Sequence, residues 1–185
     1  MSEFPLDRRN IIDEFKGLSV EEIKAKIPKH DFSVAAFNID YNLNIGNMVR
    51  SCNAFAGKEF IIIGKKHWDR RGSVGVQNYT NIIYLPDADA FIQWLKNNKR
   101  YVIAVDNTVD SAVCIDDITR YPDNALFVFG NECDGLPKSI YDLAQMTIKI
   151  HQYGSVRSLN VAVAAGIVMY SWIFYKKNQP NCFAT

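Results

Sequence analysis

Cysteine and net charge are both scarce in this 185-residue chain. None of its four cysteines forms a Cys-x-x-Cys pair or has a histidine nearby at zinc-ligand spacing, so neither a disulfide framework nor a metal site is indicated. This pattern favours a reducing, cytoplasmic setting. The 21 basic and 20 acidic residues leave a formal charge of +1, so any nucleic-acid binding must come from a local patch. The cysteines are Cys52, Cys114, Cys133 and Cys182.

Long apolar runs are also missing. Residues 1–10 are rich in charge and lack the apolar core of a signal peptide. The one membrane candidate, residues 161–175, is shorter than the roughly 20 residues of a spanning helix and is interrupted by Ser171, so we expect no membrane span. No Gly-x-Gly-x-x-Gly turn follows an expected strand, which disfavours a nucleotide-binding oxidoreductase.

Apolar runs that predict strands alternate with amphipathic runs that predict helices. The expected strands are residues 33–39, 60–63, 82–85, 101–105, 125–129 and 146–150, and the expected helices are 44–56, 87–98, 137–143 and 158–175. This alternation predicts an α/β fold, a parallel sheet with helices on both faces. Ligands of such sheets bind beyond the carboxyl ends of the strands, where Asp106, Gly130 and Ile150 are expected.

The length fits a single domain preceded by a helical segment. Residues 5–26 predict one or two short amphipathic helices interrupted at Gly17. Ser19 and Glu22 have the spacing of a capping box, and Pro28 ends the second helix. We therefore expect an N-terminal helical extension (1–32), a main domain (33–177) and a C-terminal tail (178–185).

A polar, glycine-containing turn immediately precedes the most apolar helix. It spans residues 151–160, and Ser158 is the expected N-cap of the helix. Such a turn leaves unpaired backbone N–H groups and converging side chains at one place, where small ligands are commonly held. An ordinary capped core helix is the alternative.

Two further segments indicate function only weakly when taken alone. In residues 44–50, Asn44 lies at a helix start and Arg50 nearly two turns along, where a surface salt bridge is the alternative. In residues 130–136, glycines flank an acidic loop that contains Glu132 and follows an expected strand, a pattern also typical of a tight turn.

Taken together and in this order, the three segments closely resemble the three motifs of the SPOUT-class RNA 2′-O-methyltransferases, specifically the TrmH (SpoU) family. The resemblance covers about residues 33–175. It implies a parallel α/β sheet whose C-terminal segment is tied in a deep trefoil knot, the SPOUT fold. It also implies S-adenosylmethionine bound in the knot and homodimers formed through the knotted region.

The resemblance assigns roles to individual residues. Arg50 would be the catalytic arginine. The cofactor would be held, largely by backbone groups, at Gly130, Ile150 and Leu159. The catalytic set would be completed by Asn44, Glu132, Ser158 and Asn160.

Two positions depart from the family pattern. Asn42 and His151 stand where family members usually have proline, and loss of proline stiffness loosens a loop. His151 is either a new RNA contact or a solvated, inert histidine. The side chains matched to catalysis are intact, so we expect an active enzyme.

The expected chemistry suits these residue types and requires no metal. A sulfonium is already a good leaving group, so the protein has to position a ribose 2′-hydroxyl in line and favour loss of its proton. The family proposal makes the arginine a general base, but guanidinium groups keep their protons in proteins. We therefore expect Arg50 to stabilise the developing alkoxide and hold the adjacent phosphate, with Glu132 holding Arg50 in place. Asn44 and Asn160 would orient the ribose and the loops.

Residues 65–72, called the basic loop below, form the densest basic stretch of the chain. Such a loop can contact phosphates while its aromatic residue stacks on an exposed base. A solvated loop is the alternative. The expected RNA-binding side chains are Lys65, Lys66, Trp68, Arg70 and Arg71.

The last helix carries two apolar stripes on different sides, and one sheet cannot bury both. We therefore expect a homodimer. One stripe is Val161, Ala164, Val168, Trp172 and Tyr175, and the other is Val163, Ile167, Tyr170 and Phe174.

The resemblance favours methylation of a ribose 2′-hydroxyl in structured RNA. Transfer RNA is expected rather than ribosomal RNA, because small single-domain family members often act on transfer RNA. The alternative is a non-catalytic RNA-binding protein that retains the SPOUT fold.

Overall fold

The computed structural model describes residues 7–179, in which strands and helices alternate. The strands are β1 (His30–Phe37), β2 (Gly57–Ile63), β3 (Ile82–Leu85), β4 (Tyr101–Val105), β5 (Val113–Cys114), β6 (Ala125–Phe129) and β7 (Met146–Lys149). The α-helices are α1 (Val20–Lys26), α2 (Asn42–Ala54), α3 (Ala88–Asn97), α4 (Lys138–Tyr141) and α5 (Val161–Lys177). Short 3₁₀ turns lie at η1 (Asp13–Phe15), η2 (Val76–Asn78) and η3 (Ile115–Asp117).

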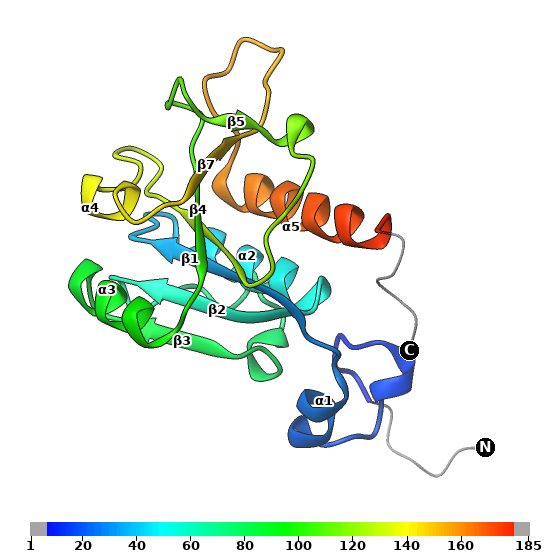
Figure 1. The fold of residues 1–185 in the computed structure, drawn as a ribbon. Coiled ribbons are helices and arrows are strands. Elements are labelled where there is room, and N and C mark those ends of the chain that lie inside the picture. Colours follow the sequence, from blue (N-terminus) through cyan, green and yellow to red (C-terminus); the bar gives the residue numbers. More distant parts are fainter. Residues whose placement is uncertain (1–6, 180–185) are drawn as a thin grey trace.

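The strands form one seven-stranded sheet in the order β3-β2-β1-β6-β4-β7-β5. Every neighbouring pair is parallel, which confirms the predicted architecture (Figure 1). The strands β1 and β6 lie at its centre, and β6 is buried along its whole length. Burial on both faces explains why these strands have continuous rather than alternating apolar sequences.

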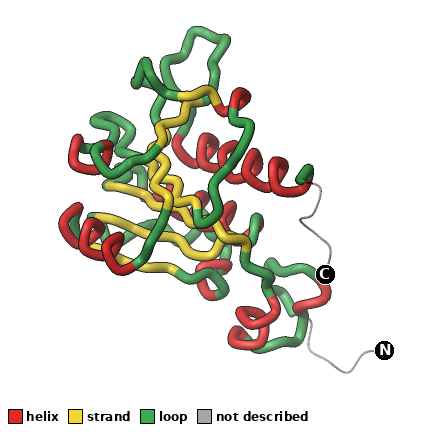
Figure 2. The backbone as a smooth tube through the Cα atoms, in the orientation of Figure 1, coloured by secondary structure: helices red, strands yellow, loops and turns green. Residues whose placement is uncertain are grey.

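Helices cover both faces of the sheet, as predicted (Figure 2). Successive side chains of β1 point to opposite faces, so Val34 joins one hydrophobic core and Ala35 the other. Helices α2 and α5 pack on the first face, where Trp172 is buried. Helices α3 and α4 pack on the second face, where Phe91 is buried.

The N-terminal segment packs against the first core. Ser19 Oγ accepts a hydrogen bond from the Glu22 N–H at 3.2 Å, and the Glu22 carboxylate accepts one from the Ser19 N–H at 2.7 Å. This capping box confirms the predicted start of α1. Ile23 on that helix is fully buried in the first core. Residues 5 and 6 of the predicted helix lie outside the described residues, as does Cys182.

Both helix starts near the expected motifs differ from the prediction. Helix α2 begins at Asn42 rather than near Asn44. The N-cap of α5 is Asn160 and not Ser158, because the Asn160 amide oxygen accepts hydrogen bonds from the N–H groups of Ala162 and Val163. Asparagine is as favourable as serine at this position, so residue type alone does not decide between the two.

Several strand limits also differ from the prediction. Strand β1 begins at His30 rather than residue 33 and ends at Phe37, and β2 begins at Gly57 rather than residue 60. The added residues at the start of β2 include Glu59, which pairs with Ser33 across the sheet. Polar residues of this kind hide a strand from any search for apolar runs. The two-residue β5 was not predicted.

Helix α5 is partly buried. Its stripe containing Val168 and Trp172 packs into the first core. The second predicted stripe is exposed by 38 to 59% of its side-chain surface. Among residues 7–179, no helix is both long and apolar enough to cross a membrane.

Candidate active site

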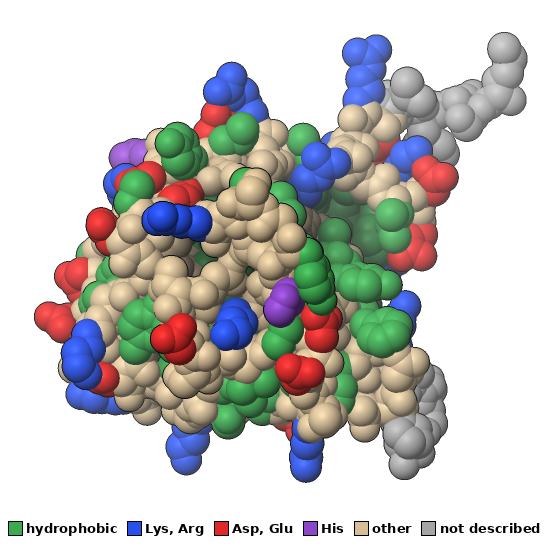
Figure 3. Space-filling view, turned by 90° about the horizontal axis from the view of Figure 1, so that it is seen from above, with side chains coloured by type: hydrophobic (Ala, Val, Ile, Leu, Met, Phe, Trp, Pro, Cys, Tyr) green, Lys and Arg blue, Asp and Glu red, His purple; other side chains and the backbone are tan. Residues whose placement is uncertain are grey.

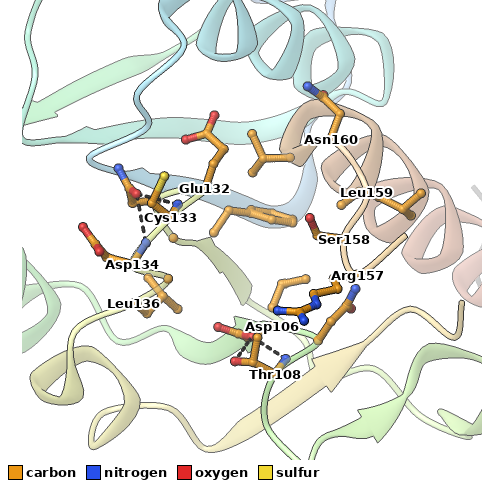
Figure 4. A pocket seen from close by; sticks show the side chains of 18 of the residues that line it. Asp106, Thr108, Glu132, Cys133, Asp134, Leu136, Arg157, Ser158, Leu159 and Asn160 are labelled. Carbon is orange, nitrogen blue, oxygen red and sulfur yellow. Dashed lines mark hydrogen bonds between the residues drawn. The ribbon is translucent and has the colours of Figure 1, made fainter. Parts of the chain in front are cut away.

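The carboxyl ends of β1, β4, β6 and β7 meet at one edge of the sheet and enclose a pocket of about 540 Å³. This volume lies within the range of roughly 300–1,000 Å³ that is typical of small-molecule sites. The pocket is lined by Tyr41 and Asn44, by residues 105–109 and 129–136, by Tyr141 and Ile150, and by residues 157–161 and Ala164 (Figure 4).

The pocket brings together most of the residues expected at the site, although they are distant in the sequence. Lining it are Asn44, Gly130, Glu132, Ile150, Ser158, Leu159 and Asn160. Three segments that are separate motifs in the sequence therefore form one cavity.

Hydrogen bonds join the three motifs directly. The Asn160 amide N–H donates to the amide oxygen of Asn44 at 3.0 Å, and the Asn44 amide N–H donates to Glu132 Oε1 at 2.8 Å. The second Glu132 oxygen accepts from the backbone N–H of Asp40 at 3.0 Å. Asn44 is only 7% exposed, so its amide depends on these partners. The two asparagines and Glu132 thus hold the three motifs in one arrangement.

The acidic loop after β6 is both a tight turn and a wall of the pocket. The backbones of Asn131 and Gly135 exchange two hydrogen bonds, and the Asn131 amide oxygen accepts from the N–H groups of Cys133 and Asp134. A Cβ at Gly130 would lie 2.3 Å from the carbonyl carbon of Gly135, so only glycine allows the loop to fold back this closely. Both interpretations of this segment, a functional loop and a tight turn, therefore agree with the structure.

A second group of polar side chains in the pocket centres on Asp106, which the sequence indicates only as a residue at the end of a strand. Asp106, directly after β4, accepts hydrogen bonds from the N–H and hydroxyl of Thr108 at 2.7 and 2.6 Å and from the Tyr141 hydroxyl. Burial, together with the hydrogen bond to Asp106, raises the pKa of Tyr141 above its usual value. Arg157 lines the same side of the pocket, and Figure 4 shows its side chain directed toward Asp106. The sequence signal for Asp106 as a site residue is its position directly after an apolar strand.

Arg50 lies apart from this cavity. It is exposed on α2 and is not among the residues that line the pocket in the described part of the chain. Six residues turn a helix by about 600°, so Arg50 and Asn44 leave the axis about 120° apart. Glu132, expected to hold Arg50, instead bonds Asn44 and the Asp40 backbone, which corrects that expectation.

Comparison with known proteins identifies the family. The SpoU rRNA Methylase family matches residues 31–170. The chain belongs to the SpoU family. The match includes all three motifs.

Relatives agree with this assignment. A putative tRNA (cytidine(34)-2′-O)-methyltransferase of Mycoplasma genitalium is 32% identical over 146 residues, which are 74% of this chain and 84% of that protein. A tRNA (guanosine(18)-2′-O)-methyltransferase of Aquifex aeolicus is 29% identical over 147 residues, 76% of this chain and 67% of that protein. The mouse tRNA (guanosine(18)-2′-O)-methyltransferase TARBP1 is 27% identical over 80% of this chain, which spans only 10% of that much longer protein.

Solved structures share the fold. The Aquifex aeolicus TrmH/SpoU tRNA modifying enzyme superposes with a TM-score of 0.74 at 24% identity, covering 85% of this chain and 82% of that one. The SpoU methyltransferase AviRb of Streptomyces viridochromogenes, crystallised with the cofactor AdoMet, has a TM-score of 0.71 at 24% identity and covers 83% of this chain and 62% of that one.

The two positions without the usual SpoU proline differ in their surroundings. Asn42 is the first residue of α2, a position where proline is favoured because the missing N–H has no helical partner. The helix starts there without proline. His151 is exposed, and its ring lies 4.4 Å from that of Tyr153, centroid to centroid.

The basic loop rests on the start of α2 beside the pocket. A Cβ at Gly46, within the first motif, would lie 2.6 Å from the carbonyl oxygen of Asp69. Two cations of the loop are engaged in ion pairs, Lys65 with Asp40 at 2.7 Å and Arg71 with Asp69 at 2.6 Å. Hydrogen bonding from the paired cation lowers the pKa of each aspartate.

The remaining members of the loop differ in exposure. Trp68 is half-buried against the first core, which leaves only part of its ring for stacking. Lys66 and Arg70 are exposed, and the Lys66 ammonium lies 5.6 Å from the ring centroid of Tyr84. On the face shown in Figure 3, basic and acidic side chains are interspersed rather than gathered in one basic patch.

Within residues 7–179, no group of three or more histidine, cysteine or acidic side chains has an arrangement that could hold a metal ion. Cys52, Cys114 and Cys133 are free thiols. Cys52 is fully buried, and desolvation raises its pKa to about 12. Cys133 is exposed in the acidic loop of the pocket.

Proposed function

We propose that this SpoU protein transfers the methyl group of S-adenosylmethionine to a ribose 2′-hydroxyl of a transfer RNA. The observation that carries the proposal is the hydrogen-bonded chain from Asn160 through Asn44 to Glu132, which joins the three motifs at one pocket. The Mycoplasma and Aquifex relatives are named for this reaction at nucleotides 34 and 18 of tRNA. Because these two relatives are named for different nucleotides, the nucleotide that this chain modifies has to be identified by mapping.

The pocket fits S-adenosylmethionine in size and in charge. When bound, this cofactor supplies a methyl group on a sulfonium whose departure leaves a neutral thioether. Asp106, fixed by its neighbours, presents a negative charge to a cationic ligand, and Arg157 presents a positive charge to a carboxylate. The close approach of the acidic loop to Gly130 brings backbone groups to the pocket wall. We assign cofactor binding to Gly130, Ile150 and Leu159, largely through their backbones.

Arg50 must act from outside its own pocket. It lies on α2, which packs against α5, and the next residue, Ser51, faces Gly166 of α5. The exposed apolar stripe lies on the same α5. We propose that this stripe forms a two-fold interface and that Arg50 of one subunit reaches the pocket of its partner across it. There it would stabilise the developing 2′-alkoxide and hold the adjacent phosphate.

The exposed stripe supports a homodimer as the working unit. Phe55 at the end of α2 contacts Tyr170, with ring centroids 6.2 Å apart, and Tyr170 contacts Phe174. This cluster extends the apolar surface from α5 to α2. Contiguous exposed apolar surface of this kind marks an interaction site.

The path of the C-terminal segment supports a trefoil knot. After β7 near one edge of the sheet, the chain returns across the strand ends, where Asn160 bonds Asn44, and α5 packs against α2. We include this knot in the proposal, together with a cytoplasmic location, where the free thiols would stay reduced.

The basic loop would contact the RNA backbone next to the pocket. The loop packs against the start of α2, which contributes Asn44 to the pocket, and this supports a role for the exposed Lys66 and Arg70 in holding RNA near the site of methyl transfer. The ion pairs of Lys65 and Arg71 would be exchanged for contacts with phosphates.

The test is transfer of labelled methyl from S-adenosylmethionine to unfractionated tRNA, followed by nuclease mapping of the labelled nucleotide. We expect incorporation at one ribose, and resistance of the adjacent phosphodiester to alkali. Calorimetry with S-adenosylmethionine provides the second readout. Binding of tRNA without cofactor binding or methyl transfer would instead support the non-catalytic RNA-binding alternative.

A further inference from the structure

The loop between β7 and α5 carries an exposed aromatic pair that the assigned site residues do not include. Tyr153 is 90% exposed, the highest value among the exposed large hydrophobic residues of the described chain. Its ring packs against that of His151, with centroids 4.4 Å apart and planes inclined by 41°. In Figure 1 this loop, drawn in orange, stands clear of the sheet at its upper end. The pair therefore presents a supported aromatic surface to solvent.

The same loop reaches the pocket. Arg157 and Ser158 at its end line the cavity, and Ile150 at its beginning does so as well. A ligand that contacts Tyr153 therefore lies near the proposed reaction site, because the loop that carries Tyr153 begins and ends at the pocket. The loop also exposes Val156, by 63%, but Gly154, Ser155 and Arg157 surround that residue, so the loop lacks the continuous apolar surface of the α5 stripe.

Sheet order places this aromatic pair and the basic loop on opposite sides of the pocket. The basic loop follows β2, whereas the aromatic pair follows β7, four strand positions away. At about 4.8 Å between neighbouring strands, the two strands are about 19 Å apart. An RNA strand that touches both loops must cross the carboxyl ends of β1, β6 and β4, where the pocket opens.

We propose that Tyr153, backed by His151, stacks on an unpaired nucleobase of the substrate RNA next to the methylated nucleotide. Aromatic side chains bind single-stranded bases in this way because every base has a π-face. The role rests on the proposed function and deepens it, since it makes the loop a determinant of which unpaired nucleotide enters the pocket. The basic loop supplies charge on one side, and Tyr153 supplies a stacking surface on the other.

The test compares Tyr153→Ala, Tyr153→Leu and Tyr153→Phe. Binding of fluorescently labelled unfractionated tRNA is measured by anisotropy at several salt concentrations. We expect Tyr153→Ala to weaken RNA binding at least about fivefold, because a stacked base contributes roughly 1–3 kcal/mol and 1.4 kcal/mol corresponds to tenfold. Tyr153→Leu should resemble alanine, whereas Tyr153→Phe should stay within about twofold of wild type. The slope of affinity against salt should not change, because no phosphate contact is removed.

Two controls identify the cause of any loss. The calorimetric affinity for S-adenosylmethionine and the sedimentation coefficient should match those of wild type in all three variants. Loss of cofactor binding would assign Tyr153 to the cofactor site, and dissociation would assign it to a contact between copies. Either result overturns the inference, as does a leucine variant that binds RNA like wild type.

Failure of this inference is distinguishable from failure of the proposed function. A wild-type protein that methylates tRNA, with unchanged RNA binding by Tyr153→Ala, would refute only the stacking role. A wild-type protein that binds tRNA through Tyr153 but transfers no methyl group would refute the enzymatic proposal and leave the stacking role intact.

Discussion

Replacing Asn160 tests the feature on which the site depends most directly. Its amide oxygen accepts from the N–H groups of Ala162 and Val163 at 2.9 and 3.3 Å, and its N–H donates to Asn44 at 3.0 Å. Asn160→Ala removes an N-cap, which costs about 1 kcal/mol. It also leaves the oxygen of the buried Asn44 amide without a donor, which costs about 1–3 kcal/mol more. We expect a total loss of roughly 2–4 kcal/mol in the free energy of unfolding.

Asn160→Asp separates the two roles. The carboxylate still caps α5 and is favoured at the positive end of the helix by about 0.3–1 kcal/mol. It has no N–H for Asn44, so two acceptor oxygens would meet where a 3.0 Å hydrogen bond was. We therefore expect a smaller loss of stability than for alanine, but an equal loss of methyl transfer and weaker cofactor binding.

The assay combines urea unfolding, calorimetry with S-adenosylmethionine and methyl transfer to tRNA. For a chain of 150–250 residues, each kcal/mol lowers the melting temperature by about 2–4 °C, so thermal unfolding gives an independent check. An alanine variant that loses less than about 0.5 kcal/mol would refute the capping argument. A stable and fully active aspartate variant would refute the role of the Asn160 to Asn44 link.

Three further predictions follow from the proposed site. Arg50→Ala should lower turnover at least about a hundredfold in methyl-transfer assays while calorimetry shows near-normal cofactor affinity, because Arg50 acts on the ribose; normal turnover would remove this mechanism. Replacing the four cations of the basic loop (Lys65, Lys66, Arg70 and Arg71) with alanine should weaken RNA binding and flatten its salt dependence, since fewer counterions are released. An unchanged slope of affinity against salt would show that the loop is solvated and does not contact RNA. Aspartate at both Tyr170 and Phe174 should give inactive monomers in sedimentation experiments, because unpaired charge is placed in the interface; wild-type monomers with full activity would contradict the dimer.

The sequence predicts the sheet well because its strands are buried on both faces and their apolar runs are hard to mistake. It predicts the members of the pocket through three motifs whose common edge follows from parallel pairing. The hydrogen-bond partners could not be predicted in the same way. The sequence analysis pairs Glu132 with Arg50, but Glu132 bonds Asn44 in the structure, because the choice of partner depends on helix rotation and side-chain reach.

Other differences have the same origin in long-range contacts. The sequence predicts Ser158 as the cap of α5, but Asn160 both caps the helix and bonds Asn44, and only the folded chain shows the second contact. Asp106 is indicated by the sequence only as the residue after a strand, whereas its contact with Tyr141 joins two segments 35 residues apart. No local pattern encodes such a meeting.

The Asn160 to Asn44 hydrogen bond spans 116 residues of sequence, and this has a consequence during protein synthesis. At roughly 5–20 residues per second, a ribosome takes about 6–23 s to make the chain between these two residues. Throughout that interval Asn44 lacks its hydrogen-bond partner from the last motif. The edge of β1 that pairs with β6 is likewise unpaired until β6 has been synthesised. A nascent chain therefore has no complete pocket until its final helix has left the ribosome.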